Sequence, residues 1–369
     1  MKYLILGQGK SGTTALTYAI AEQVADAKLY FEPNNINKIE FYRHSNLVAK
    51  KLLESFNDFE KNTLSFFDKL IFLVRDPRDA LVSRVLYTTY SSNFIYDYNK
   101  FKKYVDLIKQ KETSPHSVHF FEIVNAIKEL DNTDILEFVN NLNRKTIEFW
   151  KAYNYLFHLK KYESFVQNQN DEISTYLGLT LSSSEIKVPT QRKRVERTKT
   201  SGDWKNWFTE GDVKYFYPYL NEFINTFSYS DDWELNVHPV IMNEFASDYV
   251  TRVANERKKQ DNQKLNKKLQ QLSQDDQKLN EQLQQLSQDN QKLNEQLQQL
   301  SQDNQKLIGW IERLDNLIAS IVSSNRWKLG NAVYKAYRKI TLKAFEPMPQ
   351  EHRNKIIEEL ELLKDNRKI

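Results

Sequence analysis

The sequence predicts an α/β fold: a P-loop-type parallel sheet flanked by helices, followed by a long helix that forms a parallel coiled coil. Three observations lead to this prediction. Short apolar segments alternate with longer helix-like segments over residues 1–240. A glycine-rich turn follows the first apolar segment. Leucine then recurs at every seventh residue over 258–322, which is the pattern of a coiled coil.

Five apolar segments are expected to be strands, at about 3–7, 28–33, 46–52, 69–76 and 155–165. A helix is expected from about 12 to 25, between the first two strands. Strands separated by helices favour a parallel sheet, and such sheets bind ligands at the carboxyl ends of their strands. Gly7, Glu32, Lys50 or Lys51, and Arg75 come at or near those ends, so we expect the site there.

Composition limits the classes of function. The 369-residue chain has no cysteine, which excludes disulfides, thiolate metal sites and a cysteine nucleophile. Its hydrophobic content of 40% together with a mean hydropathy of −0.69 indicates a globular part joined to a very polar one. The net charge of +4 is compatible with an anionic ligand. There is no basic, apolar leader and no long apolar run, so we expect a cytoplasmic protein.

The segment from Gly7 to Thr14 begins like a nucleotide-binding loop. Glycine occupies the first and sixth positions, but the seventh, which is lysine in an ATPase, is Thr13. A strand, a glycine-rich turn and a helix start direct backbone N–H groups at an anion. Lys10 adds a cation, and Ser11, Thr13 and Thr14 add hydroxyl groups. The alternative is a plain strand-to-helix turn.

A second segment, 70–87, combines a buried strand with Arg75 at its end and Ser83 in the helix that follows. These two side chains can face one phosphate, or they can be a structural arginine and a helix-surface serine. A third segment, 197–213, carries Arg197, Lys199 and Lys205 before a helix expected near Thr209. Its alternative is a basic surface loop.

Together the three segments resemble the sulfotransferase superfamily, whose members transfer a sulfuryl group from 3′-phosphoadenosine 5′-phosphosulfate (PAPS). GQGKSGTTAL resembles the family's 5′-phosphosulfate loop, RDPRDALVSR its 3′-phosphate motif, and GDWKNWFT its third PAPS-binding segment. KKYESF, at 160–165, is similar to the family's Tyr-Glu-Asp segment. The resemblance spans about 1–236.

The resemblance implies roles for individual residues. The 5′-phosphosulfate would be held by Lys10, Ser11, Gly12, Thr13 and Thr14. The 3′-phosphate would be held by Arg75 and Ser83, with Arg197 as a further contact. Tyr162 would approach the adenine, and Trp204 is a further contact. The family's Arg-Lys-Gly reads Arg197-Thr198-Lys199 here, which puts the role of Lys199 in doubt.

Soluble sulfotransferases use a histidine two residues after a strand-end lysine as the base, but the residue two after Lys50 is Leu52. Carbohydrate-type members use a glutamate, and Glu32 at the end of the second strand is the leading candidate. His44 is the alternative base. Lys10 would stabilise the leaving phosphate, and Lys50 would contact the bridging oxygen. Glu32 could instead be a carboxylate paired with a basic neighbour.

Three domains are expected: a sulfotransferase domain at 1–240, a coiled coil at 258–322 and a basic amphipathic helical tail at 323–369. Leucines from Leu265 to Leu314 form one row of the coiled-coil seam, and polar residues alternate in the other row. This pattern favours a parallel homodimer over a disordered Gln/Asn tract. The tail is expected either to contact anionic lipid or to pack on its own dimer. A further amphipathic helix is expected at about 350–366.

The sequence therefore predicts a PAPS-dependent sulfotransferase acting on a hydroxyl, of a saccharide or glycan precursor. A P-loop small-molecule kinase, with Asp76 as its magnesium ligand, and a coiled-coil scaffold with a vestigial site are the alternatives. No metal and no nucleic acid are expected. His116 and His119 have a spacing that suits a metal, but two surface histidines on a helix are favoured.

Overall fold

The computed structural model describes residues 1–33, 36, 43–56, 58–182, 186–189, 192, 196–198, 200–340, 354, 355 and 358. The chain divides into two compact units, Met1–Lys267 and Lys268–Ile369.

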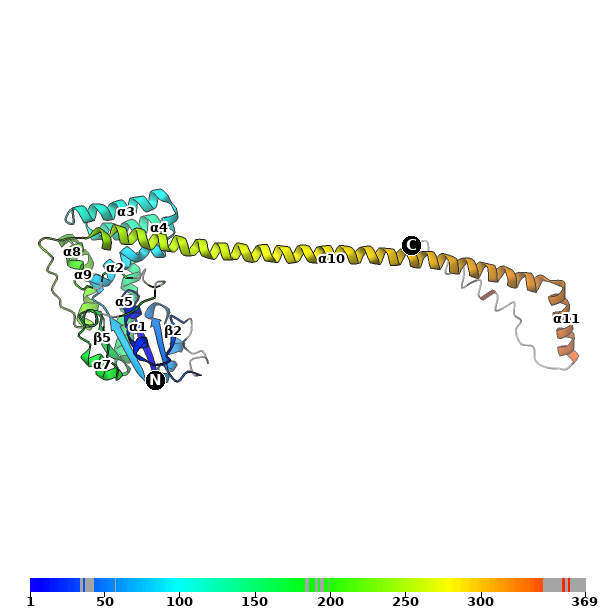
Figure 1. The fold of residues 1–369 in the computed structure, drawn as a ribbon, viewed down its shortest axis with the longest axis horizontal. Helices are drawn as coiled ribbons and strands as arrows, with labels where there is room; N and C mark the ends of the chain where they lie inside the picture. The colour runs from blue at the N-terminus through cyan, green and yellow to red at the C-terminus, as the bar shows by residue number, and fades with distance from the viewer. Residues whose placement is uncertain are drawn as a thin grey trace. The chain divides into compact units, whose positions relative to one another are not determined.

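The first unit is built on a five-stranded sheet whose neighbouring strands are all parallel (Figure 1). The strands are β1 (Lys2–Gly7), β2 (Lys28–Phe31), β3 (Leu47–Leu52), β4 (Lys69–Val74) and β5 (His158–Lys161). They lie in the order β2-β3-β1-β4-β5, with β1 in the centre. The expected parallel α/β fold is confirmed. Because β4 ends at Val74, Arg75 stands just beyond the carboxyl end of its strand.

Helices connect the strands and cover both faces of the sheet. They are α1 (Thr13–Gln23), α2 (Pro77–Tyr87), α3 (Tyr98–Thr113), α4 (Phe120–Asp131), α5 (Ile135–Tyr153), α6 (Tyr162–Val166), α7 (Asp171–Leu177), α8 (Trp204–Trp207) and α9 (Glu210–Thr226). Thr209 caps α9 by accepting a hydrogen bond from the backbone N–H of Asp212, so this helix begins where the sequence predicted.

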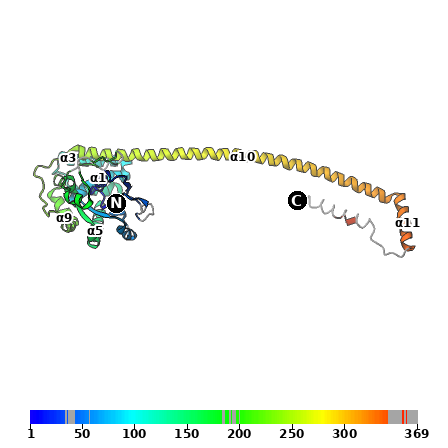
Figure 2. The ribbon, with the colours of Figure 1, turned by 60° about the horizontal axis from the view of Figure 1, so that its bottom comes forward.

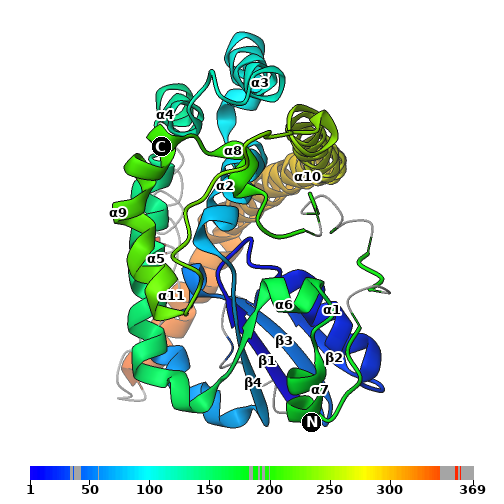
Figure 3. The same ribbon diagram turned by 90° about the vertical axis from the view of Figure 1, so that its left-hand side faces the viewer.

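Side chains along β1 point alternately to the two faces of the sheet, so the core around the sheet has two layers. Tyr3 and Ile5 face a layer formed with α1, α6 and α7, whereas Leu4 and Leu6 face a layer formed with α5 and α9. Figure 3 shows these two groups of helices on opposite sides of the strands. With both faces covered, the carboxyl edge of the sheet is the place left for a ligand.

A third apolar cluster joins α2, α3 and α4 to the beginning of α10 (Ser247–Ser323). Tyr249, Val250, Val253 and Ala254 of α10 are fully buried in this cluster. The helix therefore starts inside the globular core of the first unit. It runs without a break to Ser323 (Figure 2), which confirms a single long helix over the expected coiled-coil segment.

The second unit contains the remainder of α10 and the separate helix α11 (Asn325–Ile340). The seam leucines of α10 from Leu272 to Leu314 are exposed in the single chain. Most of the helix expected at 350–366 lies outside the described residues. Within the described ranges, no helix combines the length and apolar character needed to cross a bilayer.

The two histidines with metal-like spacing do not lie on a helix face. His119 is the N-cap residue of α4, and its Nδ1 lies 2.6 Å from Thr209 Oγ1. His116 precedes it in a turn. Among the described residues, no cluster of three or more His, Cys, Asp or Glu side chains is arranged to hold a metal ion.

Candidate functional site

The glycine-rich loop joins the central strand β1 to α1 in the geometry of an anion-binding turn. Gly12, the N-cap residue of α1, has φ = 86°, and no side chain caps the helix there. The first-turn N–H groups of a helix have no acceptor within the helix and carry its positive dipole end. A Cβ on Gly12 would lie 2.3 Å from Cδ2 of Tyr162, so only glycine allows this close approach.

Two charged side chains fix the middle of the loop. Glu54 Oε1 accepts hydrogen bonds from the backbone N–H of Gly9 at 2.8 Å and from Arg84 Nη2 at 3.0 Å. Arg84 Nη2 also donates to the Gly9 carbonyl at 2.9 Å. Ser11 Oγ donates to the carbonyl of Gln8 at 2.6 Å, which turns this hydroxyl into the loop.

The loop forms one wall of a cavity of about 370 Å³ at the carboxyl edge of the sheet. This volume is within the range of small-molecule sites. Ten predicted site residues line the cavity, and Ser11 and Trp204 do not; the ten are Lys10, Gly12, Thr13, Thr14, Glu32, Lys50, Arg75, Ser83, Tyr162 and Arg197. His44, the alternative base, is not among the lining residues, and its ring lies 6.0 Å from that of Tyr30.

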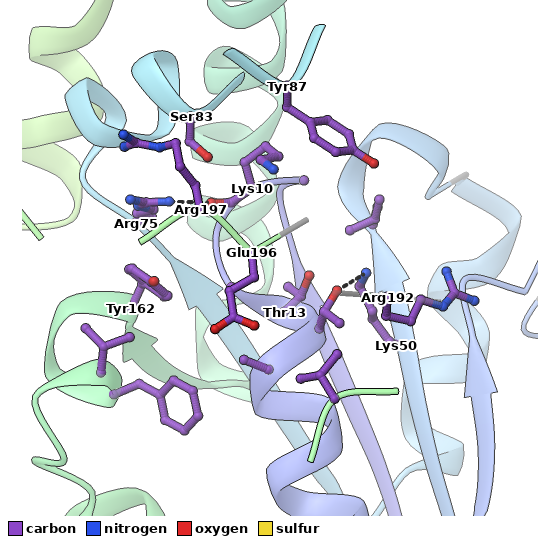
Figure 4. A pocket seen from close by; sticks show the side chains of 18 of the residues that line it. Lys10, Thr13, Lys50, Arg75, Ser83, Tyr87, Tyr162, Arg192, Glu196 and Arg197 are labelled. Atoms are coloured by element: carbon purple, nitrogen blue, oxygen red, sulfur yellow. Dashed lines mark hydrogen bonds between the residues drawn. The ribbon is translucent and has the colours of Figure 1, made fainter. Parts of the chain in front are cut away.

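At one end of the cavity, two buried arginines have N–H groups without acceptors. Arg75 Nη1 donates to the Lys10 carbonyl at 3.1 Å, and Arg197 Nη1 pairs with Asp203 at 2.7 Å. The Nε of Arg75 and the Nε and Nη2 of Arg197 are buried and have no partner in the described part of the chain. Ser83 is buried beside them (Figure 4). Buried cationic donors without acceptors are costly, so this end is built for an anion.

Lys10 brings a third cation to the same end. Its Nζ lies 3.8 Å from the centre of the Tyr87 ring. Burial lowers the pKa of Lys10 well below its ordinary value, and the positive charges of Arg75, Arg197, Arg84 and Lys50 lower it further. A bound anion would relieve this repulsion and keep the ammonium group protonated.

The three sequence motifs are held together by hydrogen bonds behind the cavity. The fully buried Asp79 accepts from the backbone N–H groups of Gly202 at 2.6 Å and Trp204 at 2.9 Å. Arg78 pairs with Asp76 at 2.7 Å and lies 4.2 Å above the ring of Trp204. Trp204 is therefore a support for the second motif and does not line the cavity. Asp76 is likewise not a lining residue, because it caps α2 and pairs with Arg78.

Glu32 and Lys50 form the opposite end of the cavity. Lys50 Nζ donates to Glu32 Oε1 at 2.5 Å and to Thr14 Oγ1 at 3.1 Å, and it lies 4.3 Å from the Phe31 ring. The sequence analysis gave pairing with a basic neighbour as the alternative role of Glu32, and this ion pair is present. Burial lowers the pKa of Lys50, although the charge of Glu32 opposes this shift. Lys50 connects the anion-binding loop to the strand-end carboxylate.

The backbone is strained at both ends of the cavity. Lys10 has φ = 73° and Glu32 has φ = 50°, in the left-handed region that residues with side chains seldom occupy. Of the six non-glycine residues with positive φ in the described ranges, only these two line the cavity. Such strain concentrates at functional sites, where surrounding structure maintains it.

Lining residues that were not predicted from the sequence include Tyr87, Tyr90, Arg192 and Glu196. The rings of Tyr87 and Tyr90 are stacked with centroids 5.3 Å apart, and the Arg192 guanidinium lies 4.1 Å from the Phe31 ring. The two tyrosines end the RDPRDALVSR helix or follow it, so their proximity to the motif was a usable signal. Arg192 and Glu196 precede the third motif segment, which begins at Arg197. Lys199 lies outside the described residues.

Comparisons with known proteins give little further information. No family model matches the chain, and no curated protein matches it. Nine chains of solved structures match, among them mouse sulfotransferase SULT7A1 complexed with PAP. That match has 17% sequence identity and a TM-score of 0.38, and it covers 62% of this chain and 86% of that one. At this TM-score the likeness supports no conclusion about function.

We predict that the Glu54 clamp maintains the shape of the loop. In Glu54→Ala, the Gly9 N–H and Arg84 lose a buried acceptor, which should lower the free energy of unfolding by about 1–3 kcal/mol. Glu54→Gln keeps an acceptor for Gly9 and should lose less. Chemical denaturation followed by tryptophan fluorescence measures both variants. Glu129→Ala, at an exposed surface pair with Lys103, is the control. Equal stability of Glu54→Ala and the control would contradict the clamp.

Proposed function

We propose that this protein transfers a sulfuryl group from PAPS to a hydroxyl of an acceptor, in the class of saccharides or glycan precursors. The observation that carries the proposal is the pair of buried arginines with three unsatisfied N–H groups beside an uncapped helix N-terminus. One cavity therefore offers two adjacent anion-binding groups. A nucleotide with phosphates on both its 3′ and 5′ oxygens matches that arrangement.

The residues present fit this nucleotide. The loop from Gly9 to Thr14 would hold the 5′-phosphosulfate through backbone N–H groups, hydroxyls and Lys10. Arg75, Ser83 and Arg197 would hold the 3′-phosphate with charge-assisted hydrogen bonds. Tyr162, whose ring edge adjoins Gly12 and whose ring centre lies 4.5 Å from the guanidinium carbon of Arg75, would approach the adenine. Bound PAPS would supply a sulfuryl group activated as an anhydride with phosphate.

The chemistry then requires charge stabilisation and a base. The S–O bond to phosphate breaks as the acceptor oxygen bonds to sulfur, and negative charge grows on the phosphate. Lys10 and the N–H groups at the start of α1 stabilise that charge. Lys50, whose Nζ donates to Thr14, contacts the oxygen that bridges sulfur and phosphorus. Glu32, at the other side of Lys50, accepts the proton of the acceptor hydroxyl.

The kinase alternative has less support. A P-loop kinase needs lysine where Thr13 stands, and a magnesium-binding acid next to the phosphates. Asp76, which the sequence offered for this role, is paired with Arg78 and does not line the cavity. The scaffold alternative does not explain why so many buried cations surround a cavity.

We also propose that the chain forms a parallel homodimer through α10. Its leucines recur every seven residues and are exposed in the single chain, so a second copy would bury them. Asn290 and Asn304 in the other row of the seam are satisfied only by their counterparts in register, which favours the parallel arrangement.

We predict that adenosine 3′,5′-bisphosphate stabilises the protein against heat and that ATP with Mg²⁺ does not. At a hundred times its dissociation constant, a ligand adds about 2.7 kcal/mol. For a unit of this size the melting temperature should rise by several degrees, at roughly 2–4 °C per kcal/mol. Differential scanning fluorimetry measures the shift.

The matched variants are Arg75→Ala and Arg192→Ala, because both arginines line the cavity at different ends. The shift should disappear in Arg75→Ala and persist in Arg192→Ala. Stabilisation by ATP with Mg²⁺ alone would favour the kinase, and stabilisation by neither nucleotide would favour the scaffold.

We predict that Glu32 is the base. Glu32 and Glu196 are the two carboxylates that line the cavity within the described residues, so they form a matched pair. Glu32→Gln should lower the rate of ³⁵S transfer from labelled PAPS to a panel of saccharides by about 10²–10⁴-fold. Binding of 3′,5′-ADP should stay within a few-fold of the parent. Glu196→Gln should change the rate little. Equal losses in the two variants would remove Glu32 from this role.

A further inference from the structure

Helix α11 has an unusual distribution of charge for a helix of 16 residues. It contains no aspartate or glutamate. Its basic residues are Arg326, Lys328, Lys335, Arg338 and Lys339. No acid within the helix can therefore offset its positive charge.

The side chains of α11 separate into two stripes. Leu329, Val333 and Ile340 recur at helical spacing on one face, with exposed fractions of 70%, 62% and 82%. Lys328, Lys335 and Lys339 share a second stripe, because they are spaced by seven and four residues. Trp327 and Tyr334, seven apart, form a third row about 100° around the helix from the lysines. Both are exposed. The helix is thus amphipathic, and its apolar face is exposed in the part of the chain that the structure describes.

The coiled-coil seam of α10 does not continue along this apolar face. The seam pattern ends with Leu314, Ile318 and Ile321, and its next positions are 325, 328, 332, 335 and 339. Those positions are Asn, Lys, Ala, Lys and Lys, so they follow the basic stripe. The two helices are also separate, because α10 ends at Ser323 and Ser324 caps the start of α11. The Oγ of Ser324 accepts a hydrogen bond from the backbone N–H of Trp327 at 3.2 Å. A dimer formed through the seam of α10 therefore does not cover the apolar stripe of α11.

We propose that α11 binds the surface of an anionic lipid bilayer. Its apolar stripe would enter the boundary of the acyl chains, Trp327 and Tyr334 would lie at the level of the headgroups, and the lysines would face lipid phosphates. Charge favours lipid over a second copy of the helix: two α11 helices packed on their apolar stripes would bring two sets of five positive charges near each other, whereas anionic lipid attracts these charges. This inference does not depend on the proposed activity.

The test is flotation of the full-length protein with vesicles. Vesicles of phosphatidylcholine and phosphatidylglycerol at 3:1 should carry the protein, and vesicles of phosphatidylcholine alone should not. Each cation near such a surface contributes about fivefold to binding. Charge reversal at three lysines should therefore weaken binding on the order of a hundredfold or more, in the variant Lys328→Glu/Lys335→Glu/Lys339→Glu.

The matched control reverses three lysines of α10, each one residue before a seam leucine and outside the seam: Lys278→Glu/Lys292→Glu/Lys306→Glu. It has the same change in net charge and should bind within a few-fold of the parent. Equal loss in the two triple variants would overturn the proposal, because general charge would then explain binding.

A second variant, Leu329→Ser/Val333→Ser, tests what covers the apolar stripe. It should reduce flotation and leave the molar mass by light scattering unchanged. If the parent does not float with anionic vesicles and this variant dissociates to monomers, a second copy covers the stripe and the lipid proposal is wrong. Failure of the parent to float, with an unchanged molar mass, would also overturn it.

Discussion

The candidate site depends on the concentration of positive charge at the carboxyl edge of the sheet. Lys10, Arg75, Arg197 and Lys50 surround one cavity, and burial and mutual repulsion lower the pKa of Lys10 well below its usual range. Three guanidinium N–H groups have no acceptor among the described residues. The fold holds this arrangement together without a ligand, at a cost of about 1–3 kcal/mol for each unsatisfied donor. An anionic ligand removes that cost, which makes the site selective for charge.

Carboxylates outside the cavity keep the cations in position. Glu54 holds Arg84 and the loop, and Asp203 holds Arg197 by one nitrogen while its other nitrogens stay available. Asp79 docks the third motif against the second through two backbone N–H groups, and burial raises its pKa. These acids stabilise the arginines without neutralising the cavity. Within the described part of the cavity lining, the only carboxylates are Glu32 and Glu196.

Those parts of the site that depend on local sequence were predictable. The glycine spacing predicts the loop, and the strand-Arg-Pro-helix pattern predicts the positions of Arg75 and Ser83. Both predictions are possible because each motif is a short continuous segment of the sequence. The orientation of Ser11 was not predictable. Its hydroxyl donates to the carbonyl of Gln8 within the loop and does not point into the cavity. Arg192 and Glu196 come to the cavity through tertiary contacts that no local pattern specifies. The first turns of α10 were not predictable for the same reason: Tyr249 and Val253 precede the heptad pattern but are buried in the globular core.

The most direct test of the account is the contribution of a 3′-phosphate to binding, measured by isothermal titration calorimetry with adenosine 3′,5′-bisphosphate and adenosine 5′-phosphate. The two ligands differ only in the group assigned to Arg75, Ser83 and Arg197. The account predicts that the bisphosphate binds on the order of a hundredfold more tightly or better, since charge-assisted hydrogen bonds contribute about 1.5–3 kcal/mol each. Equal dissociation constants would contradict it, because the unsatisfied arginine N–H groups would then have no role in binding the donor.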